Sequence, residues 1–136
     1  TEKKMIFLDS SVIIAYYNEK DKHHNRAVKI IKTISSGKED IIINENIFNE
    51  CVTVLFLRLR DLQKVITIGE TLKKVPTLMN NTNLFNKTWE TFKNQKDTKL
   101  SFTNCSIIAT MIQERILSLA TFDQDFSKIK DIKIIN

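Results

Sequence analysis

The chain has 136 residues, which favours one compact domain over residues 1–136 rather than two. It contains one proline and two glycines, Gly37 and Gly69, too few for the tight turns of an all-β barrel and too far apart for a glycine-rich phosphate loop. The net charge of +5, from 21 basic and 16 acidic residues, suits a polyanionic partner or an ordinary mixed-charge surface.

The first half of the chain alternates short apolar runs with helical patterns. In chain order, we expect a strand over 5–8, a helix from Ser11, a helix over 21–36 that ends at Gly37, a strand over 41–43, and a helix over about 45–60 capped within 44–46. His23 and His24 lie in a charged stretch and are expected to be a solvated helix start without partners.

The second half continues this alternation. The pattern stays helical from 61 to 95, with a break around Pro76 where residues 75–79 can form a short strand. After it, we expect a helix from Ser101 through Arg115, a strand over 117–121, a turn over 122–126 and a strand over 132–135.

Two sets of apolar side chains are spaced for the buried face of a helix. The first set is Phe85, Trp89 and Phe92, which we expect to pack in the core rather than stack on bases. The second set lies on the helix that Ser101 begins and comprises Phe102, Cys105, Ile108, Ala109 and Ile112.

The cysteines and the N-terminal stretch exclude further classes. Cys51 and Cys105 have neither C-x-x-C spacing nor a histidine at ligand spacing, so we expect two buried free thiols. The only apolar run within residues 1–17 contains Asp9, is too short to cross a bilayer and lacks a cleavage pattern. We therefore expect no membrane segment and a cytoplasmic location.

Short strands alternating with amphipathic helices predict an α/β fold of three layers, with a mostly parallel central sheet and helices on both faces. Ligands of such sheets bind beyond the carboxyl ends of the strands. Asp9 and Asp123 each follow a predicted strand, Glu50 lies in the first half of the helix after 41–43, and Asn104 lies in the first turn of the helix before 117–121. We expect all four at this edge.

Three converging carboxylates repel one another and lose hydration unless protons or a cation neutralise them. Mg²⁺ and Mn²⁺ prefer such hard oxygen ligands, and they can activate water for attack on phosphorus. An acidic pocket on a basic protein is therefore typical of a phosphodiesterase that acts on nucleic acid.

Each of these residues also has a purely structural interpretation. The alternatives are a helix cap for Asp9, a salt bridge for Glu50, local hydrogen bonding for Asn104, and turn formation for Asp123 and Asp125.

Four motifs together resemble the PIN domain family, and within it the VapC-type toxins of toxin–antitoxin pairs. They are Phe7–Ile14 (FLDSSVII), Glu50 in a helix, Leu100–Cys105 (LSFTNC) and Thr121–Phe126 (TFDQDF). The resemblance covers nearly the whole chain in the right order and spacing. It implies a Mg²⁺- or Mn²⁺-dependent endoribonuclease, a homodimer, and an antitoxin protein that occludes the site.

Asp9, Glu50 and Asp123 match three acidic positions of that family, and Asn104 stands where the family has an aspartate. The resemblance thus implies catalytic and metal-binding roles for these four, and an amide without charge implies weaker metal binding and activity. Thr121 matches a frequent polar position near the site. Auxiliary candidates are Ser11, Thr121 and Asp125, whose carboxylate could compensate for Asn104.

Two other functions compete with the ribonuclease. One is a catalytically silent PIN domain that binds RNA or a protein through the same surface. The other is an α/β phosphotransfer domain, which is disfavoured because Ser11 occupies the place of its second acid and no acidic pair precedes Asp9. For RNA, the candidate contacts are basic residues on or next to the helices that carry the site, namely Arg58, Arg60, Lys99 and Arg115.

Overall fold

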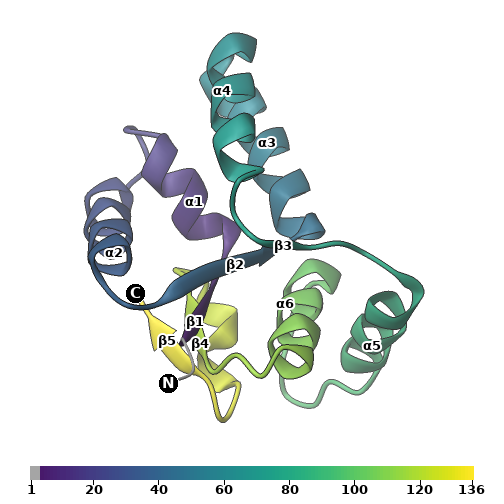
Figure 1. Ribbon diagram of the computed structural model, residues 1–136. Coiled ribbons are helices and arrows are strands. Elements are labelled where there is room, and N and C mark those ends of the chain that lie inside the picture. Colours follow the sequence, from purple (N-terminus) through teal and green to yellow (C-terminus); the bar gives the residue numbers. More distant parts are fainter. Residues whose placement is uncertain (1–3) are drawn as a thin grey trace.

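The computed structural model describes residues 4–136 and confirms the α/β fold (Figure 1). A five-stranded, fully parallel sheet lies at its centre, in the order β3-β2-β1-β4-β5. Its strands are β1 (Met5–Leu8), β2 (Asp40–Asn44), β3 (Thr77–Leu78), β4 (Ser118–Ala120) and β5 (Lys133–Ile135). The chain moves from β1 to β2 and β3, then returns to β4 on the other side of β1. The topological switch point, where ligands of parallel sheets bind, therefore lies between the carboxyl ends of β1 and β4.

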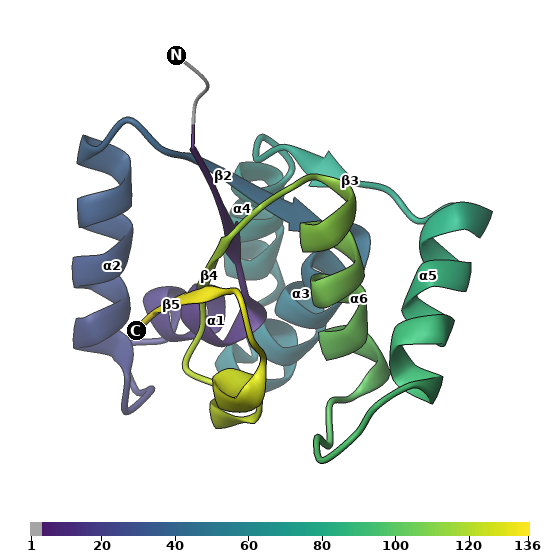
Figure 2. The same ribbon diagram turned by 90° about the horizontal axis from the view of Figure 1, so that it is seen from below.

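Helices cover both faces of this sheet. They are α1 (Ser10–Tyr17), α2 (His24–Ser36), α3 (Glu45–Leu59), α4 (Leu62–Leu72), α5 (Thr82–Lys93) and α6 (Phe102–Gln113), with the 3-10 helix η1 (Gln124–Lys128) before β5. Figures 1 and 2 show α1 and α2 on one side, α5 and α6 on the other, and α3 with α4 as a hairpin that extends beyond the sheet. No helix in the described part of the chain is long and apolar enough to span a membrane.

Buried side chains of β1 and a polar anchor on β2 position the helices. Ile6, Phe7 and Leu8 are almost inaccessible to solvent, because both faces of this central strand are covered. The buried side chain of Asn44 caps α3 by accepting from the amide of Ile47 at 3.0 Å, while its Nδ2 contacts hydroxyl groups on α6. This residue therefore ties the start of α3 to α6. Cys51 and Cys105 are buried and free, as predicted.

The aromatic face of α5 differs from the prediction. Phe85 and Trp89 are 59% and 45% exposed, and Phe92 is also exposed, so their placement in the core is wrong. The reason is that α5 packs on α6 rather than on the sheet and buries only Leu84 and Thr88. Four aromatic rings, those of Phe85, Trp89, Phe92 and Phe102, contact one another at centroid distances of 5.7 to 6.2 Å and form an exposed aromatic strip.

Two smaller predictions are corrected at the ends of elements. Ile112 and Phe102, expected to face inward, are 70% and 37% exposed, because they lie in the last and first turns of α6. Residues 124–126 of the expected turn over 122–126 instead belong to the 3-10 helix η1, which Asp123 caps by accepting from the amide of Asp125.

Candidate active site

Asp9 lies at the end of β1 with only 3% of its surface exposed. Its Oδ1 accepts from the amide of Ser10 at 2.8 Å, so the residue caps α1. Its Oδ2 accepts from the hydroxyls of Ser11 at 2.9 Å and Thr121 at 2.7 Å. The capping interpretation is therefore correct, but the carboxylate also joins the carboxyl ends of β1 and β4.

The two hydroxyl groups connect Asp9 to the segment that follows β4. The Ser11 hydroxyl accepts from the amide of Phe122 at 3.0 Å, and the Thr121 hydroxyl accepts from the amide of Asp123 at 2.9 Å. Each hydroxyl thus donates to the carboxylate and accepts from the backbone. Ser11 and Thr121 fix the distance between the two aspartates, which gives the auxiliary candidates a structural role.

Asn104 enters the site from the first turn of α6. Its amide nitrogen Nδ2 donates to Oδ2 of Asp123 at 3.0 Å, and its backbone N–H donates to the hydroxyl of Ser101, the N-cap of α6. Its hydrogen bonding is therefore both local and directed at Asp123. The neutral amide donates a hydrogen bond to one oxygen of the Asp123 carboxylate. A second carboxylate in its place could offset the charge of that oxygen only when protonated or bound to a cation.

Glu50 lies on the second turn of α3 and faces Asp9 and Asp123 without a cationic partner. The pKa of Glu50 is raised by partial burial and by the negative charge of Asp9, and it is lowered by a hydrogen bond with Ser10. Burial raises the pKa of Asp9 as well, although three hydrogen bonds oppose this effect. Within residues 4–136, no lysine or arginine pairs with Glu50, so the salt-bridge interpretation is wrong for the part of the chain that the structure describes.

Two depressions meet at these residues. A smaller one of about 280 Å³ is lined by Asp9, Glu50, Asn104 and Asp123 together, and a larger one of about 680 Å³ is lined by the last three of them. The structure thus brings the four candidate residues to one place, between the start of α1, α3, the start of α6 and the end of β4. In residues 4–136, however, no three His, Cys, Asp or Glu side chains are gathered closely enough to hold a metal ion by themselves.

Comparison with known proteins identifies the family. The family model of the PIN domain matches residues 6–132. The chain belongs to the PIN domain family. A search of curated proteins found no match to this PIN domain.

Solved structures share the fold of this PIN domain at low sequence identity. The toxin VapC20 of Mycobacterium tuberculosis, described as cleaving the sarcin-ricin loop, is 22% identical with a TM-score of 0.81, over 93% of this chain and 96% of that one. VapBC2 of Rickettsia felis, bound to a promoter DNA fragment, is 13% identical with a TM-score of 0.73 and coverages of 97% and 98%. DNA-bound VapBC of Salmonella typhimurium is 14% identical with a TM-score of 0.69, covering 98% of both chains. At these identities the likeness shows the fold alone.

The four basic candidates of this PIN domain separate into two pairs. Arg58 lines the smaller depression, and Lys99 lines the larger one together with Asp125. Arg60 caps the far end of α3, and Arg115 follows the far end of α6; neither lines a depression that meets the acids. A role of these four in RNA binding stays a prediction.

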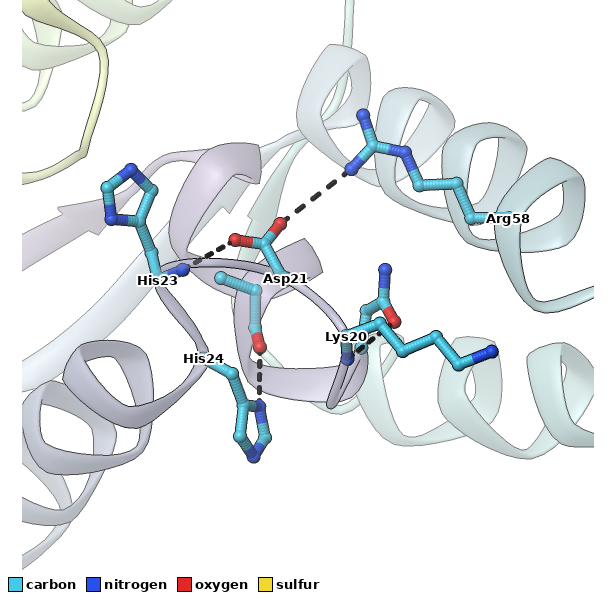
Figure 3. Close-up of polar contacts among 7 residues, drawn as sticks. Lys20, Asp21, His23, His24 and Arg58 are labelled. Carbon is cyan, nitrogen blue, oxygen red and sulfur yellow. Dashed lines mark hydrogen bonds and ion pairs between the residues drawn. The ribbon is translucent and has the colours of Figure 1, made fainter.

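Sequence reasoning missed two residues of this PIN domain that line the smaller depression, Asp21 and His23. Asp21 pairs with Arg58 of α3 at 3.7 Å (Figure 3). The ring of His23 stacks on that of Phe122 at a centroid distance of 4.6 Å. His24 also has a partner, because its Nδ1 lies 2.8 Å from the carbonyl oxygen of Ala15. The prediction of unpartnered histidines is therefore wrong. The linker between α1 and α2 folds back onto the site, which no spacing in the sequence indicates.

Proposed function

We propose that this PIN domain is a Mg²⁺- or Mn²⁺-dependent endoribonuclease and the toxin of a toxin–antitoxin pair. One observation carries the proposal: three carboxylates from three separate elements, Asp9, Glu50 and Asp123, face one pocket, and no lysine or arginine among the described residues forms an ion pair with any of them. Such an arrangement is costly for the apo protein, and a bound divalent cation would remove the cost.

The donor set fits a hydrated cation. All four side chains offer hard oxygen ligands, which Mg²⁺ and Mn²⁺ prefer, and these ions keep several water molecules when a protein supplies few ligands. Such a hydrated ion does not require the three carboxylates to form a closed ligand group by themselves. When bound, the ion would stabilise negative charge on a phosphodiester and activate a water molecule.

The residues of the chain supply orientation and charge around that chemistry. Ser11 and Thr121 hold the Asp9 carboxylate in one rotamer, because both hydroxyls donate to its Oδ2. Asn104 orients Asp123 in the same way. Glu50, which is more exposed, supplies the third carboxylate of this pocket from α3. Since Asn104 adds no charge, we expect reduced activity in this protein.

Partners belong to the same proposal. RNA is the substrate, a cognate antitoxin protein covers the site, and action on RNA places the protein in the cytoplasm. The structural neighbours from Rickettsia felis and Salmonella typhimurium are toxin–antitoxin complexes, which supports an antitoxin partner here. The exposed aromatic strip on α5 and α6 supports a homodimer, because contiguous apolar surface of this kind marks protein interfaces.

A second function is favoured by a specific contact. Asn104 occupies one oxygen of Asp123, and no three acidic side chains in the described chain form a closed ligand group. Both facts suit a catalytically silent PIN domain that binds RNA or protein.

Cleavage of a labelled mixed-sequence RNA over a Mn²⁺ titration separates the two functions. We expect cleavage by the wild-type protein that depends on Mn²⁺ and disappears in Asp9→Asn. The matched control is Glu45→Gln, which removes the same charge from the start of α3, outside both depressions. Intact RNA at saturating metal, combined with RNA binding in EDTA, would establish the silent module instead.

A further inference from the structure

The two depressions form one continuous surface with the acids in the middle. They share Glu50, Val54, Asn104 and Asp123. From these residues the smaller one extends along α1 and α3 to Arg58, and the larger one extends past the start of α6 to Lys99. Each depression has a single lysine or arginine in its lining, Arg58 in the smaller one and Lys99 in the larger one.

Arg58 forms an ion pair but keeps its hydrogen-bond donors free. Its Nη1 lies 3.7 Å from Oδ2 of Asp21, and the Asp21 side chain, only 16% exposed, accepts from the amide of His23 at 2.9 Å. Figure 3 shows Asp21 between the backbone of His23 and the guanidinium group. That group makes no hydrogen bond within residues 4–136. A guanidinium has five N–H donors in a planar fork, so Asp21 can orient it while the others hold a phosphate.

Lys99 is the corresponding cation at the other end. It lies two residues before Ser101, the N-cap of α6, and its side chain is exposed. No carboxylate among the described residues forms an ion pair with it. Its charge is therefore available to an anion that occupies the larger depression.

We propose that one RNA strand lies across both depressions, with a backbone phosphate on Arg58 at one side of the acids and another on Lys99 at the other. This path rests on the proposed ribonuclease function and deepens it. A polyanion that approaches four carboxylates, those of Asp9, Asp21, Glu50 and Asp123, needs cations close by, and two flanking contacts would place the phosphodiester between them over the acids. Asp21 is the positioning residue of the Arg58 contact.

The first test compares matched losses of charge. Arg58→Gln and Lys99→Gln remove the proposed contacts, whereas Lys29→Gln and Lys64→Gln remove the same charge from exposed positions outside the two depressions. We expect KM for RNA to rise about tenfold in Arg58→Gln and in Lys99→Gln, because each loses a hydrogen bond to a charged group. In the two control variants KM should rise less than about twofold. The kcat should change little in all four. Arg58→Lys should restore part of the affinity, and Asp21→Asn should raise KM a few-fold. Equal KM values in Arg58→Gln and Lys64→Gln would overturn the path.

The second test determines on which side of the cleavage position Arg58 and Lys99 each contact the RNA strand. After the cleavage position is mapped, the same variants are assayed on RNA shortened from the 5′ or the 3′ end. One shortening should abolish the effect of Arg58→Gln alone, and the other that of Lys99→Gln alone. If a single shortening abolishes both effects, the strand does not cross the acids.

The proposed function and the path fail in different ways. A wild-type protein that binds RNA but does not cleave it at saturating metal refutes the ribonuclease. The path is then tested by the anisotropy of labelled RNA in EDTA, where the dissociation constant should rise in Arg58→Gln and Lys99→Gln and not in the two controls. Equal constants in all four variants refute the path.

Discussion

Asn104→Asp places a carboxylate against the carboxylate of Asp123. It removes the 3.0 Å hydrogen bond from Nδ2 of Asn104, and a hydrogen bond to a charged group contributes about 1.5–3 kcal/mol. It also adds repulsion, for which two unit charges about 4 Å apart give about 4 kcal/mol at an effective dielectric constant of 20. Uptake of a proton limits that repulsion, because the paired acids then titrate as a unit. In EDTA at neutral pH we expect the free energy of unfolding to fall by about 2–4 kcal/mol.

A divalent cation should reverse the sign of this effect. The new carboxylate then becomes a charged ligand, so Asn104→Asp should bind Mn²⁺ more tightly, gain more stability from it than the wild type, and cleave RNA faster. Asp9→Asn in the same background should abolish the gain, since both positions serve the same ion.

Urea denaturation with EDTA or with saturating Mn²⁺ measures both effects. The matched control is Asn49→Asp, which adds the same charge to the larger depression at an exposed position of α3. If Asn104→Asp and Asn49→Asp change stability equally in EDTA, or if Mn²⁺ stabilises Asn104→Asp no more than the wild type, the account of this position is refuted.

Four further expectations follow from the same geometry. Because the folded state raises the pKa of Asp9 above its ordinary 3.8, the ionised carboxyl costs stability as pH rises above about 4. In metal-free melts, the stability of Asp9→Asn relative to wild type should therefore be higher at pH 7 than at pH 4. The opposite order contradicts this expectation. Thr121→Val should lower stability by about 2–3 kcal/mol and Thr121→Ser by less than 1.5, as urea midpoints will show, because only serine keeps the hydroxyl between Asp9 and Asp123. Trp89→Asp should convert a sedimenting dimer to a monomer while Asn86→Asp should not; a wild-type monomer refutes the dimer. RNA affinity should fall steeply between 50 and 200 mM salt, and a flat response would indicate a protein partner instead.

The acids were predictable because their positions follow from local patterns and one topological rule. A strand that ends at Leu8 leaves Asp9 at the carboxyl edge whatever the rest of the chain does, and the same holds for Asp123 after β4. Glu50 and Asn104 follow from the requirement that crossover helices begin at this edge. The family resemblance identified the motifs. The alternation of strands and helices predicted by itself that the acids lie at the carboxyl edge of the sheet.

Tertiary layering and loop folding were not predictable in the same way. Helical spacing shows that Phe85 and Trp89 share a face, but it does not show whether that face meets the sheet or lies outside another helix. The contact of Asp21 with Arg58 joins residues far apart in the sequence through an irregular linker, so no periodicity encodes it.

Direct measurement of Mn²⁺ binding tests the central claim, that the acids at the carboxyl edge of the sheet hold a divalent cation. The electron paramagnetic resonance signal of free Mn²⁺ is recorded while wild type, Glu50→Gln and the control Glu45→Gln are titrated. Glu45 lies at the start of the same helix and accepts from the amide of Asn80, away from both depressions. We predict saturable loss of the signal with wild type and Glu45→Gln, and clearly weaker binding with Glu50→Gln. Equal binding by Glu50→Gln and wild type, or no binding by the wild type at millimolar Mn²⁺, would contradict the account.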